Sequence, residues 1–185
     1  MKRYVLDASA LMTLFEDRPG ADKVEDLLRK AVEAQQLLLL SVIQWGEVYY
    51  SVWRNRGEEA ANQQLGEIAE LPIEVLDVDQ PTTKLAAALK ATYRLPYADC
   101  FAAAVAQQRK ATLVTADKDF APVEEQVSIL WAAMDRQYKM QRNLIQSDPA
   151  VMMGKPVILN AATVRRAPAV QEAASLSQSR HSSRS

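Results

Sequence analysis

Tyr4-Val5-Leu6-Asp7-Ala8-Ser9-Ala10-Leu11 is the stretch on which the fold of this chain depends. Residues 4–6 favour a short apolar strand, and the small and apolar residues after Asp7 favour a helix. Asp7 therefore stands at the end of a predicted strand, where an ionised carboxylate is costly unless it is paired, hydrogen-bonded or bound to a metal. Ligand sites of open α/β sheets form at the carboxyl ends of strands, so we expect Asp7 to form the floor of an active site.

The rest of the chain alternates predicted strands with predicted helices. Further strands are expected at 37–42, 73–78 and 112–115, with a weak edge strand at 127–130. Helices are expected at 9–16, 22–36, 43–56, 58–70, 82–93 and 98–110, and a turn at 116–120. Because alternating strands and helices build parallel sheets, the sequence predicts an α/β fold with a parallel sheet of four to five strands.

Charge divides the chain of 185 residues into two parts. Residues 1–131 hold 14 Lys and Arg against 20 Asp and Glu, a net charge of −6, whereas residues 132–185 hold eight against three, a net charge of +5. We expect one domain over 1–131 and a C-terminal extension over 132–185. The extension is expected to be helical at about 134–144 and disordered over 161–185, which contain no Phe, Tyr, Trp or Ile.

Composition also limits the class of protein. The single cysteine, Cys100, excludes an internal disulfide and suits a reducing cytosol. No apolar run approaches the roughly 20 residues that span a bilayer, and the apolar run near the N-terminus breaks at Asp7, which is unlike a signal peptide. We therefore expect a cytoplasmic protein with no membrane partner.

Acids recur where the predicted strands end. The acids and the hydroxyls beside them are Asp7, Glu47, Asp99, Asp117, Asp119, Ser9 and Thr115. Crowded carboxylates raise one another's pKa, so a cluster of them calls for a counter-charge. Mg²⁺ and Mn²⁺ prefer carboxylate and water oxygens, and such ions can activate water and stabilise the leaving oxygen in phosphodiester hydrolysis. The single histidine, His181, lies in the extension.

Single acids also have structural explanations. Asp99 suits a helix N-terminus, and Asp117 and Asp119 suit a turn. Asp7 and Glu47 are harder to explain in this way, because Asp7 ends an apolar strand and Glu47 lies on an otherwise apolar helix. The conjunction of the acids, rather than any one of them, indicates a metal site.

Four segments resemble the signature blocks of PIN-domain nucleases, and in length and spacing they are most similar to the VapC-type toxins of bacterial toxin–antitoxin pairs. These segments are 5–11, 45–48, 96–104 and 113–120. The resemblance covers about residues 1–131 and implies a three-layer α/β/α sandwich and a Mg²⁺- or Mn²⁺-dependent endoribonuclease. It also implies an RNA substrate, a homodimer and a cognate antitoxin that blocks the cleft.

By matching position, the resemblance implies roles for the acids. Asp7, Glu47, Asp99 and Asp117 would surround the metal, Asp119 is an accessory in some members, and Ser9 and Thr115 would be supporting polar groups. Candidates for phosphate contact are Lys118, the best placed, together with Arg54 and Arg94. Trp45, Tyr49 and Trp53 share one helix face, which suits either core packing or a groove for an antitoxin segment.

Two other enzyme or nucleotide-binding classes lack their required residues in this chain. A haloacid-dehalogenase-like phosphatase requires a second Asp where this chain has Ser9, and no Gly-rich phosphate-binding loop follows any predicted strand. The alternative from a different class is a catalytically silent PIN-fold module that sequesters RNA or an antitoxin. Residues 144–158 resemble the opening of a small antitoxin-like family, which suits either a partial fusion or out-of-frame reading, or else a disordered basic extension.

Overall fold

The computed structural model describes residues 1–133. These residues belong to a compact unit that spans Met1–Lys139. The helix expected at 134–144, the disorder expected at 161–185 and the antitoxin-like segment all lie outside the described residues. Within residues 1–133, no helix combines the length and the apolar character that crossing a membrane requires.

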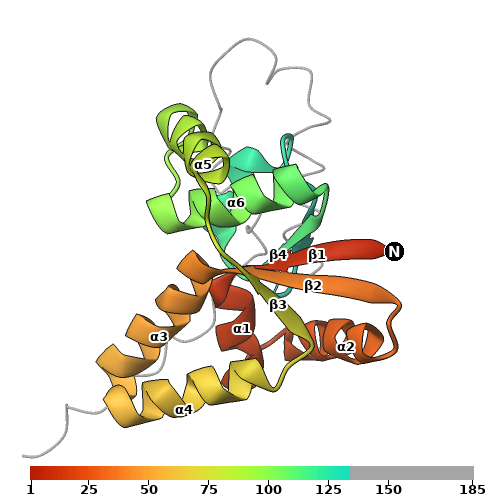
Figure 1. The fold of residues 1–185 in the computed structure, drawn as a ribbon, viewed down its shortest axis with the longest axis vertical. Coiled ribbons are helices and arrows are strands. Elements are labelled where there is room, and N and C mark those ends of the chain that lie inside the picture. The colour runs from red at the N-terminus through yellow and green to blue at the C-terminus, as the bar shows by residue number, and fades with distance from the viewer. Residues whose placement is uncertain (134–185) are drawn as a thin grey trace, which may run out of the picture. The chain divides into compact units, whose positions relative to one another are not determined.

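Within residues 1–133, five parallel strands form one sheet in the order β3-β2-β1-β4-β5 (Figure 1). The strands are β1 Lys2–Leu6, β2 Gln36–Ser41, β3 Ile73–Leu76, β4 Thr112–Thr115 and β5 Ile129–Trp131. In the central register, Val5 of β1 pairs with Leu39 of β2 and with Leu113 of β4. Because every strand runs the same way, the residues that follow the strands gather at one edge of the sheet.

The six α-helices of the described part of the chain cover the two faces of the sheet, and Figure 1 shows α5 and α6 on one side of it and α1 to α4 on the other. The helices are α1 Ala8–Phe15, α2 Ala21–Val32, α3 Val42–Arg56, α4 Glu58–Ala69, α5 Gln80–Thr92 and α6 Tyr97–Arg109. Val5, Leu39 and Leu113 pack with α5 and α6, whereas Leu6 and Leu40 pack with the other four helices. This alternation follows from the twofold period of a strand and confirms the three-layer α/β/α sandwich.

Several boundaries differ from the sequence prediction. The helix expected to reach residue 36 ends at Val32, because Ala34 adopts a positive φ of 54° that breaks the helix. Residue 36 instead begins β2, and its side-chain amide donates to the carbonyl of Leu27. The expected turn at 116–120 continues into a 3₁₀-helix, η1, over Lys118–Val123. The edge strand lies at Ile129–Trp131 rather than at 127–130.

The first turn of helix α6 lies at the candidate site beyond the carboxyl ends of the strands. Its middle is an alanine-rich run, residues 102–106, that is buried throughout. Small side chains allow the helix to lie close to the sheet, and Phe101 and Val105 join the same buried cluster. The first turn of α6 carries Asp99, so the packing of the helix fixes where that carboxyl lies.

Candidate metal centre

Three acids from three elements converge beyond the carboxyl ends of the strands. Asp7 follows β1, Glu47 lies in the second turn of α3, and Asp99 lies in the first turn of α6. One carboxylate oxygen from each lies within 4.8 Å of the others. The sequence placed these acids at one edge of the sheet, and the structure brings these three together.

Hydrogen bonds hold the Asp7 carboxylate at one oxygen. Its Oδ2 accepts from the Ser9 hydroxyl at 2.5 Å, the Ser9 backbone N–H at 3.2 Å and the Thr115 hydroxyl at 3.0 Å. Burial raises the pKa of Asp7, and these hydrogen bonds oppose that effect. Asp7 also caps the N-terminus of α1. The supporting hydroxyls thus fix the orientation of the carboxylate and favour its ionised form.

Glu47 is held by a residue that the sequence did not single out. Gln44 is fully buried, and its Nε2 donates to Glu47 Oε2 at 3.5 Å and to the carbonyl of Ala98 at 3.0 Å. Its Oε1 accepts from the hydroxyl of Ser41 at 2.6 Å. Gln44 therefore links α3 to the first turn of α6. One sequence signal could have identified Gln44: it is a polar residue in the first turn of the helix that carries Glu47.

Asp99 is the carboxyl least satisfied by the protein. Its side chain is buried, and Oδ2 is the one buried side-chain polar atom in residues 1–133 that has no hydrogen-bond partner. Burial raises the pKa of Asp99 to about 8, and the charges of Asp7 and Glu47 add to this effect. Burial likewise raises the pKa of Glu47, with a further contribution from Asp7. The site therefore gathers acidic groups whose ionised forms are disfavoured by burial and by their mutual repulsion.

Asp117 and Asp119 border the three-acid group without joining it. Asp117 follows β4, its backbone N–H donates to the Thr115 hydroxyl at 3.0 Å, and its Oδ1 accepts from the Asp119 N–H at 2.9 Å. The charge of Asp117 raises the pKa of Asp7, Glu47 and Asp99. Asp119 is exposed, and its charge also raises the pKa of Asp99. Both acids thus contribute charge at the rim.

The donor set fits a hard divalent cation. Three carboxylates within 4.8 Å repel one another, and a buried oxygen without a partner costs free energy. A cation would remove both penalties. Two oxygens bound to one Mg²⁺ at about 2.1 Å lie at most about 4.2 Å apart, so small movements would bring this group onto an ion. An all-oxygen set of ligands favours Mg²⁺ or Mn²⁺ over softer metals.

Lys118, Arg54 and Arg94, the cations predicted to contact phosphate, are all exposed and come from different parts of the fold. Lys118 is exposed and directly follows Asp117. Arg54 is exposed near the end of α3 and interacts electrostatically with Tyr50. Arg94 is exposed in the loop that precedes α6.

The aromatic face of α3 divides between core and surface. Trp45 and Tyr49 are partly buried against the core on the α1–α4 side of the sheet, with their ring centroids 6.4 Å apart. Trp53 contacts Tyr49 edge to face but is 44% exposed. The face therefore serves packing at one end and remains accessible at the other.

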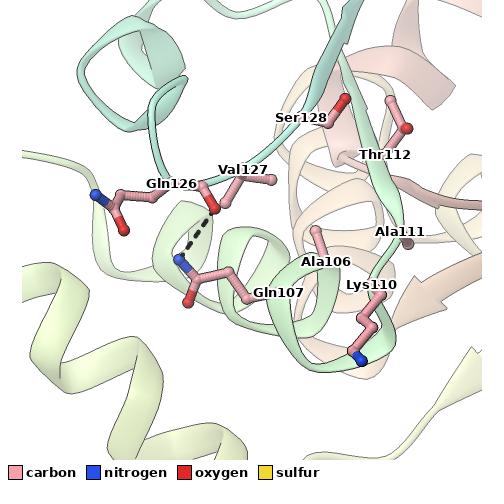
Figure 2. A pocket seen from close by; sticks show the side chains of 8 residues that line it. All are labelled: Ala106, Gln107, Lys110, Ala111, Thr112, Gln126, Val127 and Ser128. Carbon is pink, nitrogen blue, oxygen red and sulfur yellow. Dashed lines mark hydrogen bonds between the residues drawn. The ribbon is translucent and has the colours of Figure 1, made fainter.

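A pocket of about 320 Å³ lies away from the acids (Figure 2). Its lining includes Lys110, Thr112 and Ser128, and the amide of Gln107 donates to the carbonyl of Gln126 across it. Thr112 begins β4, whereas Asp117 follows the end of that strand. The pocket thus opens at the opposite end of β4 from the acid cluster, and it contributes no residue to the candidate metal centre.

The chain matches a known protein family. The model of the PIN domain family matches residues 4–126, about two thirds of the chain. This chain therefore belongs to the PIN domain family, as the four sequence segments predicted. A search of curated proteins found no match.

Solved structures share the fold. The structure of VapBC2 from Rickettsia felis bound to a promoter DNA fragment is similar with a TM-score of 0.56 and 19% identity, covering 69% of this chain and 97% of that one. VapBC-1 from nontypeable Haemophilus influenzae is similar with a TM-score of 0.56 and 19% identity, and the match covers 71% of this chain and 99% of that one. DNA-bound VapBC from Salmonella typhimurium is similar with a TM-score of 0.55 and 18% identity, and the match covers 70% of this chain and 98% of that one. At these identities the likeness shows a common fold.

Proposed function

We propose that this protein is a metal-dependent endoribonuclease that hydrolyses RNA phosphodiester bonds in the cytoplasm, as the toxin of a toxin–antitoxin pair. The observation that carries the proposal is the convergence of Asp7, Glu47 and Asp99 within 4.8 Å, with a buried Asp99 oxygen that has no partner. Membership of the PIN domain family and the fold shared with VapBC structures support it.

In this proposal the three acids hold Mg²⁺ or Mn²⁺, with Asp117 and Asp119 contributing charge at the rim. The bound ion would supply an activated water and stabilise charge on the leaving oxygen. Ser9 and Thr115 orient Asp7 and favour its ionised form through their hydrogen bonds. Proposed phosphate contacts are Lys118, Arg54 and Arg94.

The test is cleavage of RNA by purified protein with Mg²⁺ or Mn²⁺. We expect EDTA to abolish cleavage, and Asp7→Asn and Asp99→Asn each to lower it by more than about 100-fold, because even loss of a group that merely supports a metal ligand commonly costs about 10–100-fold. Asp77→Asn is the matched control: Asp77 follows β3 at the same edge of the sheet, but it is exposed and outside the acid group. This variant should cleave like the wild type.

Two results would contradict the proposal in different ways. Unchanged cleavage by purified Asp7→Asn would rule out the metal-centred mechanism. A wild-type protein that cuts no RNA in either metal would favour the catalytically silent binding module. Growth arrest of a bacterium that expresses the wild type, and its absence with Asp7→Asn, would support the role as a toxin.

We extend the proposal to a cognate antitoxin and a second copy of the chain as partners. The fold shared with VapBC structures supports the antitoxin, and the exposed part of the α3 aromatic face offers a surface for it. Light scattering of the purified chain tests the homodimer. Co-purification with the product of an adjacent gene tests the antitoxin, and we expect Trp53→Ala to weaken that association.

A further inference from the structure

A polar stripe on α3 leads from the acid group to solvent. At 100° per residue, Glu47, Tyr50 and Arg54 lie within about 60° of one another around the helix axis. Glu47 is half-buried, Tyr50 is 54% exposed and Arg54 is exposed. The core-packed aromatics Trp45 and Tyr49 lie on the opposite side of the same helix. The stripe is therefore a surface separate from the one that holds α3 to the core.

Tyr50 contacts the group of three acids through Glu47. Its hydroxyl donates to Glu47 Oε1 at 3.4 Å, and the side chain interacts electrostatically with both Asp99 and Arg54. Its ring joins neither buried core cluster of the described residues. Tyr50 thus presents a large aromatic face to solvent beside the place where the proposed reaction occurs, and core packing does not explain it.

We propose that Tyr50 is a substrate-binding residue on which a base next to the scissile phosphate stacks, while Arg54 contacts a neighbouring phosphate. The inference rests on the proposed ribonuclease function. Every base has a face that can stack on an aromatic ring, and such stacking together with cationic contacts to the backbone is how proteins hold unpaired strands. A base inside a duplex has both faces covered by its neighbours. Tyr50 therefore favours unpaired RNA over duplex RNA at the site of cleavage.

Positive charge for an RNA backbone on this stripe would come from Arg54 and from a divalent cation at the acid group. Residues 1–131 are acidic overall, and the acid group would repel phosphate unless a divalent cation is bound. Arg54 lies one helical turn beyond Tyr50, about 6 Å further along the axis, on the side away from the acids. A strand that runs along the stripe would thus meet the metal centre, an aromatic ring and a guanidinium in succession.

The test measures RNA binding separately from cleavage. All proteins carry Asp99→Asn, which should leave RNA intact in Mg²⁺, and intactness is checked on a gel. Fluorescence anisotropy then gives the affinity for a labelled single-stranded RNA and for the same sequence in a duplex. We expect Tyr50→Ala to weaken binding of the single strand by about 5- to 150-fold. Duplex binding should change much less, and Tyr50→Phe should bind like its parent.

Tyr97→Ala is the matched control. Tyr97 is 46% exposed and only two residues before Asp99, but its ring packs edge to face against Phe101, on another side of α6 from Asp99. Its loss should leave RNA affinity unchanged. Wild-type cleavage should show the same pattern, with KM raised by Tyr50→Ala and kcat changed less.

Three other outcomes would each overturn the inference, and a fourth would overturn only the proposed function on which it rests. If Tyr50→Ala binds single-stranded RNA like its parent, Tyr50 does not contact the substrate. If Tyr50→Phe fails as badly as Tyr50→Ala, Tyr50 acts by positioning Glu47 through its hydroxyl. If Tyr50→Ala instead changes oligomeric state by light scattering and leaves RNA affinity intact, the ring belongs to a protein interface. Tyr50-dependent binding by a wild type that cuts no RNA would overturn the proposed function while the stacking inference stands.

Discussion

Asp99 is buried at a helix N-terminus, with one carboxylate oxygen that receives no hydrogen bond and a pKa raised to about 8. In the unfolded chain the same group ionises near pH 4. Between these values the folded protein keeps a proton that the unfolded chain has lost. The stability that this raised pKa provides is therefore complete below about pH 4 and is lost as the pH rises through about 8.

This difference predicts how stability depends on pH in metal-free protein. In EDTA, the contribution of Asp99 should make the unfolding temperature fall between about pH 5 and about pH 8. Asp99→Asn should flatten this dependence and raise the unfolding temperature at the higher pH, because the amide carries no charge to bury. Mg²⁺ should stabilise the wild type more at the higher pH, since it competes with the proton. Thermal unfolding by circular dichroism measures all three effects, and an equally steep dependence in Asp99→Asn would contradict the assignment.

At the level of single residues, the sequence predicted positions better than contacts. Asp7, Glu47 and Asp99 were predicted to meet because strand ends and helix starts are visible in the local pattern. The role of Gln44 was missed, since its bond to the carbonyl of Ala98 depends on how α3 crosses α6, 54 residues apart in the chain. The lack of a partner for Asp99 Oδ2 likewise appears only when every neighbouring group is placed.

At the level of elements, the contact between the start of α2 and the end of β5 is unusually close. Gly20 precedes α2 with a φ of 101°, and a Cβ built there would lie 2.2 Å from the carbonyl oxygen of Ala132. Lys23 donates to that same carbonyl at 2.8 Å and to the carbonyl of Trp131 at 3.0 Å. The glycine thus allows α2 to hold the residues that follow the last strand of the sheet.

We expect Gly20→Ala to destabilise the protein by about 1–3 kcal/mol, because it adds both a positive-φ penalty and a collision with rigid backbone. Gly66→Ala is the opposite control: Gly66 lies inside α4 with no atom near the added methyl, so this change should stabilise by about 0.5–1 kcal/mol. Urea unfolding gives both values. A neutral Gly20→Ala would show that the end of β5 is not held in this way.

The order of elements was predictable, whereas some of their ends were not. Alternating apolar runs at strand and helix spacing are local signals, and they gave the parallel sheet and its covering helices. The end of α2 was misplaced because nothing in the sequence marks Ala34 as a residue of positive φ. The sequence predicted only a turn at 116–120 where the 3₁₀-helix Lys118–Val123 begins, because a turn and the start of a 3₁₀-helix share the same local sequence signals.

At the level of the whole molecule, the net charge changes sign near the boundary between the two compact units of the chain. The unit Met1–Lys139 holds 16 Lys and Arg against 21 Asp and Glu, a net charge of −5, whereas residues 140–185 hold six against two, a net charge of +4. The buried core clusters of the described residues lie within 5–132. The acidic unit thus contains both the core and the candidate metal centre.

A chain that ends at Lys139 should therefore keep its unfolding temperature and its cleavage of RNA. It should bind RNA more weakly at low salt and with a shallower dependence on salt, because cations that release counterions from RNA have been removed. Anisotropy titrations over a range of KCl concentrations measure this slope. An unchanged slope would show that the basic residues beyond Lys139 do not contact RNA.

The hydrogen bonds of the Gln44 amide also limit how often α3 and α6 move apart at the site. It joins Ser41, Glu47 and Ala98 in the interior, so α3 cannot separate from the start of α6 without breaking a fully used buried group. Local opening at this seam should therefore be rare, and the hydrogen-bonded backbone amides of α6 from Cys100 onward should exchange with deuterium about as slowly as those of the central strands. A rigid seam of this kind means that the carboxylates are held together before any ligand arrives, and their alignment is already achieved when the chain folds.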